Sequence, residues 1–157
     1  MGRKRIKRIK RKRAGMPPSP LKRRFGARKI RKAKRGTLIS RLDTVFSLFI
    51  RQKYAKNGLV ACYTCPKILP IKKIQNGHYI SRSVRRLRWD ENNCRPQCWG
   101  CNCMNGGRPV DFRENLVKEI GEDEVKFLEA SRHTIFKPDE SWLLSQIQMY
   151  TSLLEKE

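Results

Sequence analysis

The chain has 157 residues, and its 37 Lys or Arg against 14 Asp or Glu give it a formal net charge of +23. This length fits one domain of ordinary size with a tail. No run of about 18 apolar residues is present, as a membrane span would require, and the chain opens with charged residues where a secretory signal would be apolar. The sequence therefore predicts neither a membrane protein nor a secreted one.

The positive charge is concentrated in residues 1–36, which contain 18 Lys or Arg and no Asp or Glu. Such a block buries too little apolar surface to offset its chain entropy, so we predict a disordered or partly helical arm. The arm should bind nucleic-acid phosphates with a salt-dependent affinity that is largely blind to sequence. Composition leaves DNA and RNA open, and basic solubilising tails have the same composition. The residues assigned to these contacts are Arg3, Lys4, Arg5, Arg23 and Arg24.

Helical periodicity begins after the arm and predicts an amphipathic helix over residues 37–57, which packs on the core and stops at Asn57 and Gly58. A short strand is predicted over residues 59–61, and residues 68–80 have the β-branched content of a hairpin. The later predicted elements are a long polar loop over residues 83–97, a short helix from near Cys98 to the Gly106 and Gly107 pair, and helices over residues 110–120, over residues 122–132 and after Pro138.

Two C-x-x-C pairs, Cys62 with Cys65 and Cys98 with Cys101, are separated by 32 residues. Two residues between thiolates let a tight turn present both sulfurs to one ion, and two such turns complete a closed four-sulfur zinc site. Disulfides and a redox C-x-x-C are the competing interpretations, and the lack of a secretion signal favours reduced thiols. A closed site stabilises the fold and does no chemistry.

Cys94 and Cys103 offer alternative zinc ligands, since other sets of four sulfurs can be drawn with them. Those sets have less regular spacing. We therefore expect both residues to be small buried or half-buried thiols.

Several chemically useful residues lie between and beside the cysteine pairs. His78 follows Gln75, Asn76 and Gly77 at the end of one predicted strand, Asn93 lies in the predicted loop, and Asn102 directly follows Cys101. A neutral His can take a proton from an attacking water, and oxygen ligands suit a hard divalent ion. Four arginines follow the His within ten residues and are candidates for gripping backbone phosphates: Arg82, Arg85, Arg86 and Arg88.

The runs C-Y-T-C, I-Q-N-G-H-Y-I-S-R-S, L-R-W-D-E-N-N, P-Q-C-W-G-C-N and V-D-F-R-E-N-L-V-K-E-I-G closely resemble the NinG or Rap recombination nucleases of tailed phages. These belong to the His-Asn-His (HNH), or ββα-metal, endonuclease superfamily. The resemblance covers about residues 56–129 and implies a small zinc-stabilised ββα-metal core. With the flanking helices and the disordered basic arm predicted above, we expect an α+β fold whose segments are the arm at 1–36, the helix at 37–57, the nuclease core at 58–108 and a helical region at 109–157.

The resemblance also implies roles for individual residues. His78 matches the general base, Asn93 the loop asparagine that holds the base region in shape, and Asn102 a ligand of a catalytic Mg²⁺ or Mn²⁺. Gln75 stands where the phage debranching enzymes of the superfamily have an Asp ligand, and Gly77 where many relatives have Asp. A neutral Gln should hold the ion more weakly than Asp would.

The function implied is a structure-selective DNA endonuclease that acts on branched, Holliday-junction-like recombination intermediates. Two cuts at a junction require two sites, so we expect a homodimer with residues 110–157 as the candidate interface, located in the host-cell cytoplasm. One alternative is a nicking or homing-type nuclease of the same superfamily. Another is a non-catalytic zinc protein that binds DNA or RNA, which would leave Asn93 and Asn102 without a role.

Overall fold

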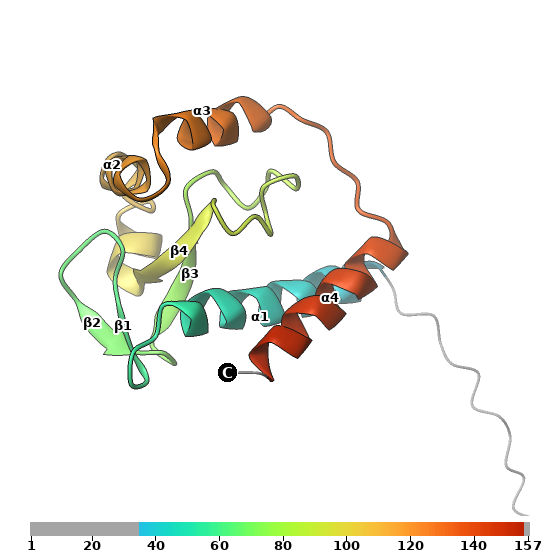
Figure 1. Cartoon of the computed structure of the whole chain (residues 1–157), viewed down its shortest axis with the longest axis horizontal. Helices are drawn as coiled ribbons and strands as arrows, with labels where there is room; N and C mark the ends of the chain where they lie inside the picture. The colour runs from blue at the N-terminus through green and yellow to red at the C-terminus, as the bar shows by residue number, and fades with distance from the viewer. Residues whose placement is uncertain (1–34, 156–157) are drawn as a thin grey trace, which may run out of the picture. The chain divides into compact units, whose positions relative to one another are not determined.

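A computed structural model describes residues 35–155 of the chain, so the predicted arm lies almost wholly outside the described residues. These residues form a mixed α+β domain (Figure 1). No helix among them is long and apolar enough to cross a membrane. The elements are α1 Arg35–Lys53, β1 Leu59–Ala61, β2 Ile68–Pro70, β3 Ile74–His78, β4 Cys94–Cys98, the π-helix η1 Gly100–Met104, α2 Pro109–Ile120, α3 Glu122–Ser131 and α4 Glu140–Leu154.

The described strands form two separate antiparallel pairs, β1 with β2 and β3 with β4. The predicted hairpin over residues 68–80 is therefore wrong, because its two halves belong to different pairs. Strand β4 was also missed, since it lies at the end of the predicted loop. Its five residues are all buried and include Arg95 and Gln97, so it lacks the alternation of apolar and polar residues that indicates a strand.

Helix α1 packs against α4 through the apolar stripe that its sequence predicts (Figure 1). Phe46 and Phe49 of α1 both contact the ring of Tyr150, with centroids 5.0 and 4.9 Å apart. The helix ends at Lys53, before the predicted stop. Asn57 and Gly58 have positive φ angles of 51° and 73°, but they form the turn that pairs Lys56 with Leu59 instead of capping the helix.

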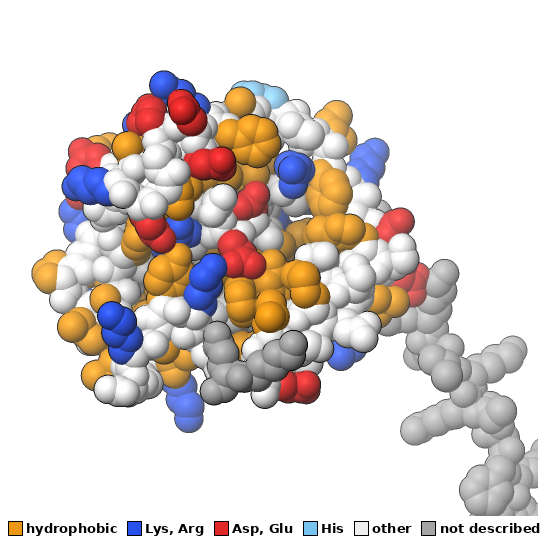
Figure 2. All heavy atoms as spheres, viewed as in Figure 1, with side chains coloured by type: hydrophobic (Ala, Val, Ile, Leu, Met, Phe, Trp, Pro, Cys, Tyr) orange, Lys and Arg blue, Asp and Glu red, His pale blue; other side chains and the backbone are white. Residues whose placement is uncertain are grey.

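Helices α2 and α3 cover the loop between β3 and β4 with a second apolar cluster. Phe112 and Leu116 of α2 and Val125 and Leu128 of α3 are fully buried there. Their charged side chains face outward: the two helices carry seven Asp or Glu against three Lys or Arg, and acidic side chains gather over them in Figure 2. The predicted helices over residues 110–120 and 122–132 agree with these elements to within one residue.

Arg95 of β4 connects the sheet to α2 through an almost completely buried guanidinium group. Its Nε lies 2.9 Å from Oε2 of Glu119, and its guanidinium lies 5.5 Å from the ring centroids of both Tyr54 and Tyr63. The two tyrosine hydroxyls donate to the same carboxylate. Burial opposes ionisation of Glu119, but the hydrogen bonds from Arg95 and Tyr63 outweigh it and lower the pKa of this carboxyl.

We predict that Glu119→Gln destabilises the protein at neutral pH by about 2 kcal/mol, because Arg95 loses its counter-ion. A carboxyl whose pKa is lowered by folding contributes stability above its unfolded pKa and loses that contribution as the pH falls. The stability difference from the wild type should therefore shrink below pH 4.5, the ordinary value for this group. Urea unfolding at pH 7 and below pH 4 measures it, with exposed Glu114→Gln of the same helix as the control. An equal difference at both pH values would contradict the assignment.

Candidate functional site

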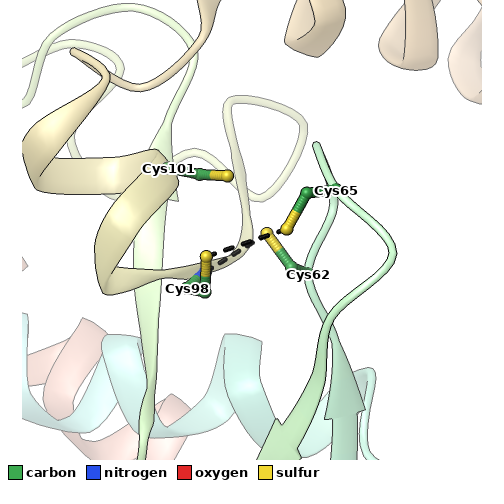
Figure 3. Close-up of side chains that lie close together, drawn as sticks. All are labelled: Cys62, Cys65, Cys98 and Cys101. Carbon is green, nitrogen blue, oxygen red and sulfur yellow. Dashed lines mark hydrogen bonds between the residues drawn. The ribbon is translucent and has the colours of Figure 1, made fainter.

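Four cysteine sulfurs converge between the β1–β2 turn and the start of η1 (Figure 3). Cys62 and Cys65 come from the turn, Cys98 ends β4, and Cys101 lies in η1. Their sulfur atoms all lie within 4.8 Å of one another. The sulfurs of Cys65 and Cys98 are 3.8 Å apart, which matches the edge of about 3.8 Å in a tetrahedron with Zn–S bonds of about 2.3 Å. The four predicted residues therefore form a cluster that fits a metal ion such as zinc.

The backbone beside Cys62 favours the thiolate form of this residue, the form that zinc ligation requires, whereas burial raises the pKa of the Cys65 thiol. The N–H of Cys98 donates to the sulfur of Cys62 over 3.2 Å. Burial alone would raise the pKa of Cys62, but hydrogen bonds from the backbone N–H groups of Cys98 and Thr64 lower it to about 7. A second link ties the first turn to β4, because Gln97 Nε2 donates to the Thr64 hydroxyl over 2.9 Å.

The other two cysteines lie outside this cluster of four. Cys94 is fully buried, as predicted, and its burial raises the pKa of its thiol, which favours the unreactive form. Cys103 is exposed, so its predicted burial is wrong. It follows Cys101 by two residues in η1, which turns its side chain away from the cluster, and its sulfur donates to Gln75 Oε1 over 3.3 Å.

Asn93 holds the long loop between β3 and β4 in one conformation. Its side chain is completely buried. Its Oδ1 accepts from the N–H of Ile80 over 2.7 Å, and its Nδ2 donates to the carbonyl oxygens of Ile80 and Leu87, each over 2.9 Å. Through this one amide, Asn93 at the end of the loop that follows His78 is tied to Ile80 at its start and to Leu87 within it.

His78 ends β3 beside this loop. Its Nε2 lies 3.1 Å from the carbonyl oxygen of Arg88, and a carbonyl can only accept, so Nε2 carries the proton and Nδ1 is left as an acceptor. Burial lowers the pKa of His78, and the nearby positive charges of Arg82 and Arg88 lower it further. The ring is therefore neutral near pH 7, the state a proton acceptor needs.

Asn102 lines the same cavity as His78, which has a volume of about 320 Å³. Its Nδ2 donates to Gln75 Oε1 over 2.8 Å, so the amide is held by its nitrogen end and its Oδ1 has no partner among residues 35–155. Gln75 does not line the cavity, and its oxygen already accepts from Asn102 and Cys103.

Asn76, to which the sequence analysis assigns no role, also lines the cavity beside His78. Its buried Oδ1 has no hydrogen-bond partner within residues 35–155. An unpartnered buried oxygen normally costs stability, which makes it a candidate for binding a ligand. The available signal was its position two residues before His78 in a strand, which places both side chains on one face.

Gly77 leaves space for a side chain of the neighbouring strand. A Cβ at this position would overlap Gln97 Oε1, so the carboxamide of Gln97 fills the place that a side chain at residue 77 would take. Packing against Gln97 therefore leaves no space at residue 77 for the Asp that many relatives have there.

The four candidate phosphate-binding arginines fall into two groups. Arg85 and Arg86 are exposed, and Arg82, with a side chain 63% exposed, borders the cavity. Arg88 instead donates through Nε and Nη2 to Asp43 over 2.9 and 2.6 Å. Asp43, the one acidic residue of α1, also accepts from Arg82 and from Trp89. It thereby fixes the backbone that presents the Arg88 carbonyl to His78.

These features define a small mixed α+β protein with two short antiparallel sheets and a four-cysteine site suited to a metal such as zinc. The family model described as "Bacteriophage Lambda NinG protein" matches residues 2–156. The chain therefore belongs to the NinG family of phage proteins.

Curated relatives share the printed name "Protein ninG". The chain is 28% identical to that of Escherichia phage 933W over 107 residues, which are 68% of this chain and 51% of the relative. It is 27% identical to that of Escherichia phage lambda over 107 residues, 68% of this chain and 50% of the relative. The chain spans about half the length of these relatives. No solved structure matches it.

We predict that Cys101→Ser removes most of the zinc from the purified protein, which should otherwise hold one ion per chain. The unfolding free energy should fall by more than about 4 kcal/mol, because metal-binding energy at such a site is also folding energy. Metal analysis and chemical denaturation measure both effects. Cys103→Ser, two residues away and outside the cluster, is the matched control and should change neither. Full zinc content in Cys101→Ser would refute the assigned ligand set.

Proposed function

We propose that this protein is a metal-dependent DNA endonuclease with an HNH-type, ββα-metal core, and that it cuts branched, Holliday-junction-like DNA. One observation carries the proposal: His78 and Asn102 line a single cavity, although 24 positions separate them in the chain. The β3–β4 pair followed by η1 supplies the order of strand, strand and helix that such a core requires. The contacts of Asn93 add support.

His78 is the general base in this proposal. With its Nε2 proton directed to the Arg88 carbonyl, Nδ1 accepts a proton from a water molecule that attacks the phosphorus. The bond from phosphorus to the 3′ oxygen breaks, which leaves a 5′ phosphate on one product and a 3′ hydroxyl on the other. Arg82, which borders the cavity and also donates to Asp43, would neutralise a non-bridging phosphate oxygen.

The proposed catalytic ion is Mg²⁺ or Mn²⁺, and the cavity offers it oxygen donors without charge. Oδ1 of Asn102 is an oxygen donor of the kind that a hard cation prefers, and the buried Oδ1 of Asn76, which has no partner among the described residues, is a second candidate ligand. Gln75, expected as a ligand from the sequence, instead orients Asn102. When bound, the ion would neutralise charge on the phosphate and on the leaving oxygen. Neutral ligands hold Mg²⁺ weakly, so the phosphate of the DNA has to complete its shell.

The charge distribution supports DNA as the partner. The loop after β3 carries the exposed Arg82, Arg85 and Arg86, of which Arg82 lines the cavity, whereas α2 and α3 are net acidic. Branched substrates need two cuts, so we further propose a homodimer. The apolar face of α4 packs on α1, so within residues 110–157 an interface would use other surfaces, such as those around exposed Val110 and Phe127.

A non-catalytic zinc protein that binds DNA or RNA is the second candidate. It is favoured by the lack of any Asp or Glu among the residues that line the cavity of His78 and Asn102. A nicking or homing-type nuclease would share the proposed chemistry and differ only in substrate. Cleavage assays on a labelled four-way junction, nicked duplex and linear duplex separate the three candidates.

We predict that His78→Ala lowers the junction cleavage rate by a factor of about 10² to 10⁴, the usual contribution of a general base. Binding of the same junction without added Mg²⁺ should change little. Asn102→Ala should raise the Mg²⁺ or Mn²⁺ concentration needed for half-maximal cleavage. Asn105→Ala, exposed just beyond η1, is the matched control. Cleavage that persists in His78→Ala would exclude His78 as the general base. Binding of the junction by the wild type without any cleavage would favour the non-catalytic candidate.

The proposed arm lies outside the described residues, but its contribution can be measured. We predict that deleting residues 1–36 weakens binding to every DNA substrate and makes the slope of log affinity against log salt less steep, because fewer phosphates are neutralised. The preference for one DNA structure over another should survive the deletion. Filter binding or anisotropy between 50 and 200 mM salt, roughly the range where such effects are large, tests this. An unchanged slope would exclude the arm as the electrostatic anchor.

A further inference from the structure

A second cavity, of about 390 Å³, lies beside the proposed catalytic cavity and shares Tyr79 and Ser81 with it. Its other lining residues are Ile80, Val84, Arg132 and His133. We propose that this cavity binds a nucleotide displaced from its base stack next to the cleaved phosphate. The inference rests on the proposed nuclease function and deepens it, because it names the feature of branched DNA that the enzyme would recognise.

The walls of the cavity suit the flat apolar face of a base. Ile80 is buried and Val84 half-buried. The ring of Tyr79 is fixed in place, since its hydroxyl donates to Glu129 over 2.6 Å and its centroid lies 5.9 Å from that of Phe112 at an interplanar angle of 30°. A rigid aromatic ring beside aliphatic side chains is a stacking surface that any base can use.

The polar edge of the cavity suits a phosphate. Arg132 and His133 are both exposed just after α3, and no Asp or Glu is among the lining residues. Glu129, which accepts from the Tyr79 hydroxyl, also forms an ion pair with Arg113 over 2.9 Å, and Arg113 pairs with Glu122 as well. With Arg82 bordering the catalytic cavity, cations lie on both sides of Tyr79. A DNA strand whose backbone passes from one cavity to the other would contact these cations at successive phosphates.

The two cavities together select for distorted DNA. A base in a continuous duplex has to lose its pairing and stacking before it can enter a side pocket, whereas a base at a branch point or mismatch has already lost part of them. Occupation of the second cavity would therefore favour branched DNA over duplex of the same sequence. The cavity volume lies in the range of about 300 to 1,000 Å³ that small-molecule sites occupy.

The test uses the full-length, zinc-loaded protein without added Mg²⁺ and junctions that carry 2-aminopurine at single positions around the cut. The wild type should bind the junction at least tenfold more tightly than linear duplex, and the fluorescence should change at one position only. Val84→Trp, which fills the cavity, and Arg132→Ala, which removes an exposed cation without disturbing the core, should each reduce the preference at least threefold. Lys137→Ala, another exposed cation after α3, is the matched control for Arg132→Ala and should preserve it.

Two results would overturn the inference. One is an unchanged preference and fluorescence pattern in both cavity variants, and the other is an equal loss of affinity for junction and duplex, which would mark a general anion-binding surface. His78→Ala separates this test from that of the nuclease function. If the wild type cuts through His78 but the cavity variants keep the preference, the cavity proposal fails and the nuclease proposal stands. If the wild type cuts nothing but the cavity variants lose the preference for the junction, the nuclease proposal fails and the proposal that the second cavity binds a displaced nucleotide stands.

Discussion

The convergence of four sulfurs is the constraint on which the site depends. Cys98 ends β4, which is paired along its length with the strand that ends in His78, and Cys101 directly precedes Asn102. Fixing these two cysteines to one ion therefore sets the distance between the strand with the imidazole and the helix with the amide. The β1–β2 turn supplies the other two sulfurs but no residue of the cavity. Its role in the fold is to complete the cluster of four cysteines that holds β4 and η1 in place.

A second set of contacts, which does not involve the four cysteines, holds the loop on the other side of the cavity. Asn93 joins both ends of the loop after His78, and Asp43 binds Arg88 and Trp89 near the end of that loop. Asp43 belongs to α1, so the packing of α1 on α4 also bears on the orientation of the imidazole through the Arg88 carbonyl. The hydrophobic core and the cavity are thus connected by one carboxylate, and a substitution in α1 can change the orientation of His78 without contacting it.

The sequence was sufficient for the parts whose signals are local. The apolar stripes predicted four helices, and the C-x-x-C spacing predicted the sulfur cluster. Pairing of the strands was not predictable in the same way, because β4 owes its stability to long-range partners. Arg95 can be buried because Glu119, Tyr54 and Tyr63 surround it and because backbone carbonyls accept from its guanidinium. Asn76, likewise, has no motif of its own, and only its neighbours in space identify it.

The lack of a carboxylate in the proposed catalytic cavity has a consequence for specificity. Amide oxygens bind a hard cation too weakly to hold it in water, so in the proposed nuclease the ion and the DNA phosphate have to bind together. Any contact that positions the phosphate then also contributes to metal affinity, by thermodynamic linkage. A nucleotide seated beside Tyr79 would be such a contact. A continuous duplex has to unpair and unstack a base before a nucleotide can enter the second cavity, so its phosphate would reach the ion without that contact. Selection between DNA structures and binding of the catalytic ion would then be the same event.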